Sequence, residues 1–113
     1  MNSEEIVQKQ VEAYNTRNLE NFLDCHATNI QLFSLFDNTP YSVGKENLKN
    51  VYKEVFENSP ELHTEIINRM VMGNIVIDHE IVTGRKGVEK STIIAIYEIE
   101  NGLISKARFI REK

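Results

Sequence analysis

The residues of this chain best placed for chemistry are three consecutive ionisable side chains, Asp78-His79-Glu80. They lie in a segment of alternating apolar and polar residues, which predicts a β-strand whose successive side chains point to opposite faces of a sheet. His79 therefore faces one side and the two acids face the other, so the run does not form a metal site. Ion pairing of the two carboxylates with Arg69 and Arg108 is the simpler interpretation.

His79 is the candidate for proton transfer because its imidazole has an unperturbed pKa near neutrality. Counting outward from a two-residue turn at Gly73-Asn74 places Asn68 directly opposite His79 on the preceding strand. The Asn68 amide could then hold one ring nitrogen or donate to a developing oxyanion. Three interpretations stay open for this pair: a hydrogen-bonded pair within the core, a ligand contact without chemistry, and catalysis.

The second half of the chain predicts four strands joined by short turns. Alternating residues indicate strands at 66–71, 75–83, 92–99 and 103–111. The Asn101-Gly102 pair is the strongest turn signal, because both residues tolerate the positive φ of a type I′ turn. Residues 84–87 are expected to form a four-residue hairpin loop.

The registers counted from these turns divide the strand residues between two faces, and a one-residue slip in a hairpin would exchange the faces of a strand. One face is expected to carry Ile66, Asn68, Met70, Ile77, His79, Ile81, Thr92, Ile94, Ile96, Ala107 and Phe109. The other is expected to carry Ile67, Arg69, Val71, Val76, Asp78, Glu80, Ile93, Ala95, Tyr97, Lys106, Arg108 and Ile110.

The first half of the chain supplies helices that can cover this sheet. Asn2 or Ser3 can cap a first helix that runs to about Tyr14, and a short second helix follows around residues 19–23. A strand at residues 30–36 and a third helix at about 45–58 complete the order. This order predicts an α+β fold, with a curved, mostly antiparallel sheet covered by the N-terminal helices as a cystatin-like α+β cone.

We expect the helices to cover the His79 face and to leave a pocket there for a small, mostly apolar molecule. The residues expected to contact this ligand are Gln10, Tyr14, Ser34, Thr92, Ile94 and Phe109. The opposite face is too apolar for open water, and burying it in a two-fold homodimer through the sheet is expected. Its apolar residues are Val71, Val76, Ile93, Ala95, Tyr97 and Ile110.

Composition restricts the class of protein. A chain of 113 residues, 41% hydrophobic and 27% charged, predicts one ordinary globular domain over residues 1–113. A net charge of −4 without a basic run argues against nucleic-acid binding. The single Cys25 excludes an internal disulfide, and neither a metal nor a cofactor is expected. No apolar run approaches the roughly 20 residues of a membrane helix, and the acidic start is unlike a signal peptide, so a cytoplasmic location is expected.

Three stretches of the chain resemble the nuclear transport factor 2-like superfamily, in particular its SnoaL-like and ketosteroid-isomerase-like branches. They are residues 6–20, 43–48 and 96–104, and the resemblance in element order extends over nearly the whole chain. It implies a conical barrel, a deep pocket and frequent homodimers.

The catalytic residues of classical ketosteroid isomerases are not matched. Those enzymes use a carboxylate base together with an oxyanion hole made of a Tyr and a protonated Asp. By the resemblance, the position of the Tyr is Gln10, the base falls near Ser34, and the Asp falls within residues 93–97, where no residue is acidic. Classical steroid isomerisation is therefore not expected.

The sequence predicts a domain that binds a small apolar ligand, with general acid-base activity of an isomerase, cyclase or hydratase type centred on His79. The competing hypothesis is a non-enzymatic accessory or interaction domain whose cavity is only core. Whether the protein is an enzyme stays open at this level.

Overall fold

The helices form where the sequence predicts them. The computed structural model describes residues 1–112, in which α1 spans Ser3–Asn15, α2 spans Leu19–Asp24 and α3 spans Lys45–Asn58. The Asn2 side chain accepts a hydrogen bond from the Glu5 backbone N–H, and the Glu5 carboxylate accepts one from the Asn2 backbone N–H. This reciprocal pair stabilises the first turn of α1.

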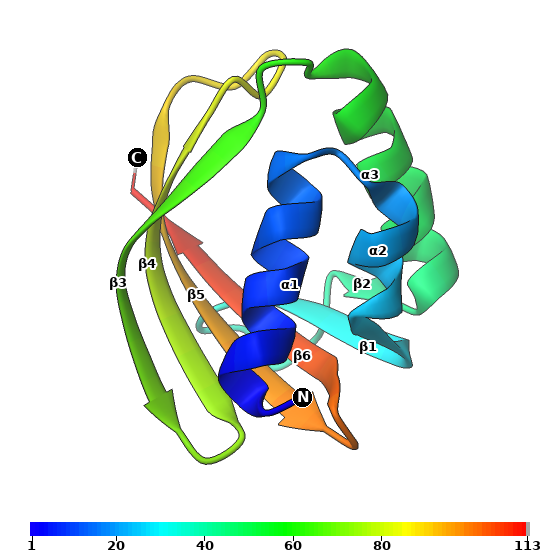
Figure 1. The fold of residues 1–113 in the computed structure, drawn as a ribbon, viewed down its shortest axis with the longest axis vertical. Helices are drawn as coiled ribbons and strands as arrows, with labels where there is room; N and C mark the ends of the chain where they lie inside the picture. The colour runs from blue at the N-terminus through cyan, green and yellow to red at the C-terminus, as the bar shows by residue number, and fades with distance from the viewer. Residues whose placement is uncertain (113) are drawn as a thin grey trace.

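A six-stranded sheet forms the other layer, and the predicted α+β class is confirmed (Figure 1). Its order is β2-β1-β6-β5-β4-β3, with β1 and β6 parallel and the other pairs antiparallel. The two-residue strand β2 was not predicted. The strands are β1 His26–Ser34, β2 Ser42–Val43, β3 His63–Met72, β4 Ile75–Thr83, β5 Ser91–Glu100 and β6 Leu103–Arg111.

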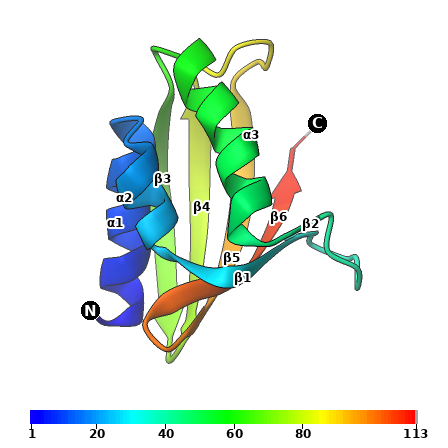
Figure 2. The ribbon, with the colours of Figure 1, turned by 90° about the vertical axis from the view of Figure 1, so that its right-hand side faces the viewer.

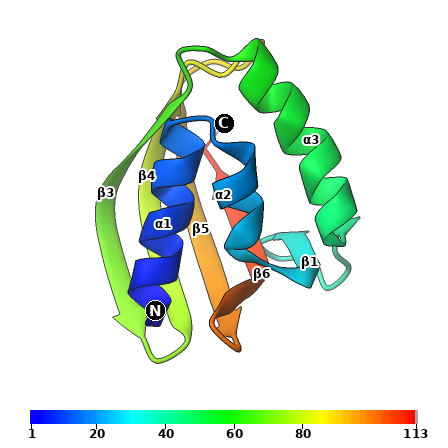
Figure 3. The same cartoon turned by 45° about the vertical axis from the view of Figure 1, so that its right-hand side comes forward.

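All three helices lie on the concave side of the curved sheet (Figures 1, 2 and 3). Helix α1 contacts β3 and β4, and α3 contacts β1 and β2. The core fills the space between the two layers. Its fully buried apolar side chains include Val7, Ile30, Leu48, Leu62, Val76 and Ile104. None of the helices within residues 1–112 is long and apolar enough to cross a membrane.

The helices cover the face of β4 opposite to the one predicted. Burial alternates along β4, so that Asp78 and Glu80 lie beneath the helices while His79 is half-buried on the outer face. Alternation determines which residues share a face, but it does not determine which face is covered. The expectation that the helices cover the more apolar face is wrong. Arg69 on β3 neutralises Asp78, so the face that carries the two acids can be buried.

The register between β3 and β4 is partly confirmed. Asn68 lies opposite His79 and Arg69 opposite Asp78, as predicted. A β-bulge between Ile66 and Asn68 then shifts the ladder, so Ile66 pairs with Glu80 rather than with Ile81. This bulge moves Ile66 to the helix-covered face.

The two remaining hairpins also differ from the expected registers. The loop between β4 and β5 covers residues 84–90, so His79 pairs with Ile94 instead of Thr92, a shift of two that leaves the faces unchanged. A bulge near Ser105 shifts β6 by one residue, so Phe109 pairs with Ala95 rather than Ile94. A shift of one exchanges faces, which places Ala107 and Phe109 beneath the helices and Arg108 outside.

Arg69 neutralises the buried Asp78. Its Nε and Nη2 atoms donate to the two carboxylate oxygens of Asp78 at 2.6 and 2.9 Å, and its Nη1 atom donates to Oε1 of Gln8 on α1 at 2.9 Å. The Asp78 side chain is fully buried, so this bidentate pair supplies the charge compensation that burial requires. It also joins α1 to the sheet. Arg108, the other predicted partner, instead lies over the Phe33 ring.

Replacing Arg69 with Met should lower the free energy of unfolding by about 3–5 kcal/mol, because it leaves the Asp78 carboxylate buried without a counter-charge. Urea unfolding followed by circular dichroism measures this loss. The matched control is Arg108→Met on the outer face, which should cost about 1 kcal/mol or less. Equal losses for the two variants would contradict the role given to the Arg69–Asp78 pair.

Candidate functional site

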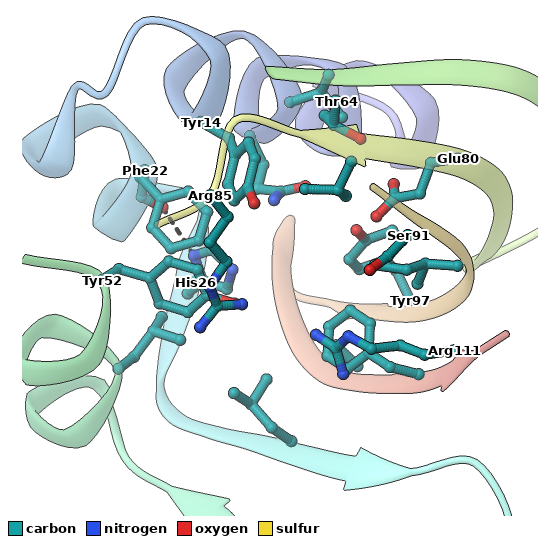
Figure 4. A pocket seen from close by; sticks show the side chains of 18 of the residues that line it. Tyr14, Phe22, His26, Tyr52, Thr64, Glu80, Arg85, Ser91, Tyr97 and Arg111 are labelled. Atoms are coloured by element: carbon teal, nitrogen blue, oxygen red, sulfur yellow. Dashed lines mark hydrogen bonds between the residues drawn. The ribbon is translucent and has the colours of Figure 1, made fainter. Parts of the chain in front are cut away.

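A small cavity lies between the helices and the covered face of the sheet (Figure 4). Its volume is about 50 Å³. The side chains come from all three helices, from five of the strands and from the loop of residues 84–90. They are Gln10, Val11, Tyr14, Phe22, His26, Leu32, Leu48, Tyr52, Thr64, Glu80, Val82, Arg85, Val88, Ser91, Ile93, Tyr97, Ala107, Phe109 and Arg111.

A wider groove of about 770 Å³ adjoins this cavity. The two share six lining residues, which are Leu32, Leu48, Tyr52, Arg85, Val88 and Arg111. The groove is completed by residues of β1, β2, α3 and the segment before β2, namely Ser34, Tyr41, Ser42, Asn47, Asn50 and Val51. A molecule too large for the inner cavity could therefore place one end inside it and the remainder in the groove.

Glu80 is the chemically distinctive residue of the cavity. Its side chain comes from β4 and is 7% exposed, and within residues 1–112 no ion pair or hydrogen bond engages its carboxylate. Burial, with a smaller contribution from the Asp78 charge, raises the pKa of Glu80 from its ordinary value of 4.5 to about 7. A carboxyl group with this pKa exchanges protons readily at neutral pH, as a general acid or base must.

Polar groups without protein partners surround Glu80. Gln10 Oε1 and Thr64 Oγ1 are fully buried and have no hydrogen-bond partner among the described residues. Burial raises the pKa of the Tyr14 and Tyr97 hydroxyls well above the ordinary value, so both stay protonated and can donate. Buried polar groups are nearly always hydrogen-bonded in folded proteins. This set of unpaired groups is therefore typical of a site that receives a polar ligand.

His26 also lines the cavity, at the start of β1. Its Nδ1 atom lies 2.7 Å from the Phe22 carbonyl oxygen, to which it can only donate. Burial lowers the pKa of His26 to about 4, so the ring is neutral at pH 7 and Nε2 is a hydrogen-bond acceptor. His26 can thus orient a ligand hydroxyl, but it is a weak base.

Half of the predicted site residues lie at this site. Gln10, Tyr14 and Phe109 line the cavity, and Ser34 lines the groove. Phe109 reaches the cavity only because of the bulge that shifts β6.

The predicted catalytic pair lies outside the site. His79 and Asn68 face each other as predicted, but on the outer face of the sheet, with Thr92 and Ile94 beside them. Neither His79 nor Asn68 lines the cavity or the groove. The position predicted for these two residues, and for Thr92 and Ile94, in a helix-covered pocket is wrong, because the helices cover the other face of the sheet.

Sequence patterns contained no signal that Glu80 is unpaired. The registers counted from the turns placed Arg69 and Arg108 on its face, and only the bulge in β6 removes Arg108 from it. The sequence also contained no signal for four other residues of the cavity, because they reach it from strand ends and a loop. They are His26, Thr64, Arg85 and Arg111.

The described residues offer no metal site. Within residues 1–112, no group of three or more His, Cys, Asp and Glu side chains is arranged to hold an ion. Asp78 is engaged by Arg69, and Cys25 is a buried free thiol.

The chain belongs to the SnoaL-like domain family, whose model matches residues 7–107. The predicted resemblance to the nuclear transport factor 2-like superfamily is thereby confirmed, and the conical α+β fold agrees with it. No protein with curated function matches the chain.

Solved structures share the whole fold at low sequence identity. An uncharacterised cystatin-fold protein from Novosphingobium aromaticivorans superposes with a TM-score of 0.89 at 23% identity, covering 98% of this chain and 99% of that one. A putative ketosteroid isomerase from Kribbella flavida superposes with a TM-score of 0.82 at 15% identity, covering 98% of this chain and 78% of that one. IdmH, a putative polyketide cyclase from Streptomyces antibioticus, superposes with a TM-score of 0.76 at 15% identity, covering 97% of this chain and 91% of that one. These likenesses show the fold alone.

Glu80→Gln should stabilise the protein at pH 8 and change little at pH 5. The raised pKa means that the folded state keeps a proton between about pH 4.5 and 7 that the unfolded state has lost, so stability falls as pH rises through this window. Gln does not ionise and avoids the loss. Thermal unfolding should show a Tm about 5 °C or more above wild type at pH 8. A lower Tm than wild type at pH 8 would mean that the Glu80 carboxylate is stabilised by a partner.

Proposed function

We propose that this protein binds a small organic carbonyl compound and removes a proton from the carbon beside the carbonyl, with Glu80 as the general base. The observation that carries the proposal is the unpaired Glu80 carboxyl in a largely apolar cavity. A buried carboxyl with no partner costs stability, and such groups concentrate at active sites. The cytoplasmic location expected from the sequence stays a prediction.

The reaction follows from the groups around Glu80. Its carboxylate takes the proton from the α-carbon, and the C–H electron pair moves into the carbonyl to form an enolate. The Tyr14 and Tyr97 hydroxyls line the same cavity as donors for the enolate oxygen. Returning the proton from Glu80 to another carbon of the conjugated system gives an isomerase. Attack of the enolate carbon on a second carbonyl of the same molecule gives a cyclase, in which the new alkoxide takes the proton from Glu80.

The volumes of the cavity and the groove support a ligand that places one end in the cavity and the remainder in the groove. A cavity of about 50 Å³ accommodates only the few atoms of the reacting end, since one water occupies about 30 Å³ of liquid. The groove of about 770 Å³ lies within the size range of small-molecule sites and would hold the remainder. Two aromatic side chains favour a mostly apolar molecule: Phe22 lines the cavity, and Tyr52 lines both the cavity and the groove.

The printed names of the structural neighbours agree with enolate chemistry, although fold alone does not transfer activity. They include a putative ketosteroid isomerase and a putative polyketide cyclase, together with AclR from Streptomyces galilaeus, a putative hydroxylase. The competing hypothesis is an accessory domain in which Glu80 has no substrate. Only a measurement of proton transfer separates the two.

A homodimer through the outer face of the sheet is part of the proposal. This face carries the four residues of the expected site that lie outside the cavity and the groove, namely Asn68, His79, Thr92 and Ile94. Its large apolar side chains are well exposed: Met70 is 60% and Ile94 is 41% exposed. Further apolar residues on it are Ile77, Ile81, Ile96 and Ile110. Exposed apolar patches of this kind mark interfaces. The interface was predicted on the other face, which the helices cover.

Proton abstraction can be tested before the substrate is known. The wild-type protein should accelerate deuterium incorporation into aryl ketones such as 1-indanone in D₂O, followed by ¹H NMR, and the rate should rise through a pKa near 7 as Glu80 ionises. Glu80→Gln should lower the enzymatic rate about 100-fold or more, because Gln cannot accept the proton.

The matched control is Glu98→Gln, which removes a carboxylate from the same sheet outside the cavity. It should leave the exchange rate unchanged. Exchange that survives in Glu80→Gln, or that is absent from wild type over a broad ketone panel, would contradict the proposed base.

The dimer is tested by sedimentation at micromolar concentration. The wild type should sediment at twice the chain mass of 13.1 kDa and bury roughly 1,000 Å² or more in the interface. Ile94→Glu, at the centre of the outer face, should give monomers. Val43→Glu, at an apolar position on β2 that is 49% exposed, should remain dimeric. A monomeric wild type would remove the proposed interface.

A further inference from the structure

Two arginines stand where the cavity opens into the groove. Arg85 and Arg111 line both spaces, and Figure 4 shows their side chains entering the site from the loop after β4 and from the end of β6. Within residues 1–112, neither guanidinium takes part in an ion pair or a hydrogen bond. Their hydrogen-bonding capacity is therefore open to a ligand.

The backbone holds both arginines in place. Gly84 adopts a φ of +76° and packs so closely on the Glu61 carbonyl that an added Cβ would lie 2.0 Å from its oxygen. The Lys86 N–H donates to the Ser59 Oγ at 3.1 Å, so the residues on both sides of Arg85 are anchored. Arg111 pairs with Ile93, and the following Glu112 N–H donates to the Thr92 carbonyl oxygen at 2.9 Å.

The positive charge at this opening contrasts with the rest of the molecule. The chain has a net charge of −4, yet no acidic residue lines the groove. The only acid of the cavity is Glu80, which lies inside. Two guanidinium groups facing a recess with low-dielectric walls attract anions and raise their local concentration.

We propose that the substrate is a keto acid whose carboxylate binds between Arg85 and Arg111 while its carbonyl end enters the cavity toward Glu80. Planar guanidinium groups match the geometry of a carboxylate and can bind it through paired hydrogen bonds. The buried and unpartnered Gln10 and Thr64 oxygens supply further polar contacts at the carbonyl end. This inference rests on the proposed function and names its substrate class.

Binding of the keto acid would also raise the pKa of Glu80. Arg111 lowers the pKa of Glu80, against the stronger effect of burial. A bound carboxylate neutralises Arg111 and removes this effect, so Glu80 becomes more basic only when the substrate is present. Binding of the acid, but not of a neutral analogue, should then be accompanied by proton uptake near pH 7.

The test compares keto acids with their methyl esters, which keep the shape and remove the charge. 4-Oxopentanoate and its methyl ester serve as the first pair, with longer keto acids beside them, and titration calorimetry at pH 7.5 measures each Kd. The wild type should bind the preferred acid about 10-fold or more tightly than its ester. The Arg85→Gln/Arg111→Gln variant should bind acid and ester equally.

Lys86→Gln is the matched control, because it removes the same charge from the neighbouring position in the loop without lining the cavity or the groove. It should keep the preference for the acid. Equal binding of acid and ester by wild type, no binding of any pair, or loss of preference in Lys86→Gln would overturn the inference.

The same titrations in Glu80→Gln separate this inference from the proposed function. A preference for the acid that persists in Glu80→Gln, combined with no deuterium exchange in wild type, would support the anion site and refute the base. Exchange in wild type without a preference for acids would refute the anion site and support the base.

Discussion

The structure depends on the burial of two carboxylates of β4. Within the described part of the chain, only Asp78 of the two forms an ion pair, with Arg69 of the neighbouring strand β3. Alternation along β4 places both Asp78 and Glu80 beneath the helices. Arg69 pairs with Asp78 through two hydrogen bonds within the sheet. A third hydrogen bond, from Arg69 to Gln8, links the sheet to α1.

Glu80 remains without an ion-pair partner among residues 1–112, while Arg69 is engaged by Asp78. The Glu80 carboxyl is left among aromatic and aliphatic side chains, with its pKa raised to about 7. An unpaired buried acid destabilises the folded state above that pH, whereas a Gln or a Leu would not. Retaining an acid where stability favours a neutral residue is a pattern of functional sites. Arg85 and Arg111 give the opening of the cavity a positive charge, whereas its interior is mostly apolar.

Local sequence patterns were sufficient for the elements and for their grouping into an α+β fold. The cap at Asn2 and the Asn101-Gly102 turn each act over a few residues, and the structure confirms both. The covered face could not be predicted from alternation, since it depends on the distant contact of Arg69 with Asp78 and Gln8. The bulges at Ile67 and Ser105 leave no clear signal in the sequence, and the second one decides where Phe109 lies. Four of the predicted ligand residues line the cavity or the groove, and the general base proposed here is Glu80 rather than its neighbour His79.

The central claim is that Glu80 is an unpaired buried carboxyl that exchanges its proton near neutral pH. The most direct measurement is a ¹³C NMR titration of the side-chain carboxyl carbons from pH 3 to 9, with the Glu80 signal assigned by comparison with Glu80→Gln. The account predicts a midpoint near 7 for Glu80. A midpoint at the ordinary value of about 4.5 would mean that water or a partner stabilises the carboxylate, and would contradict the account.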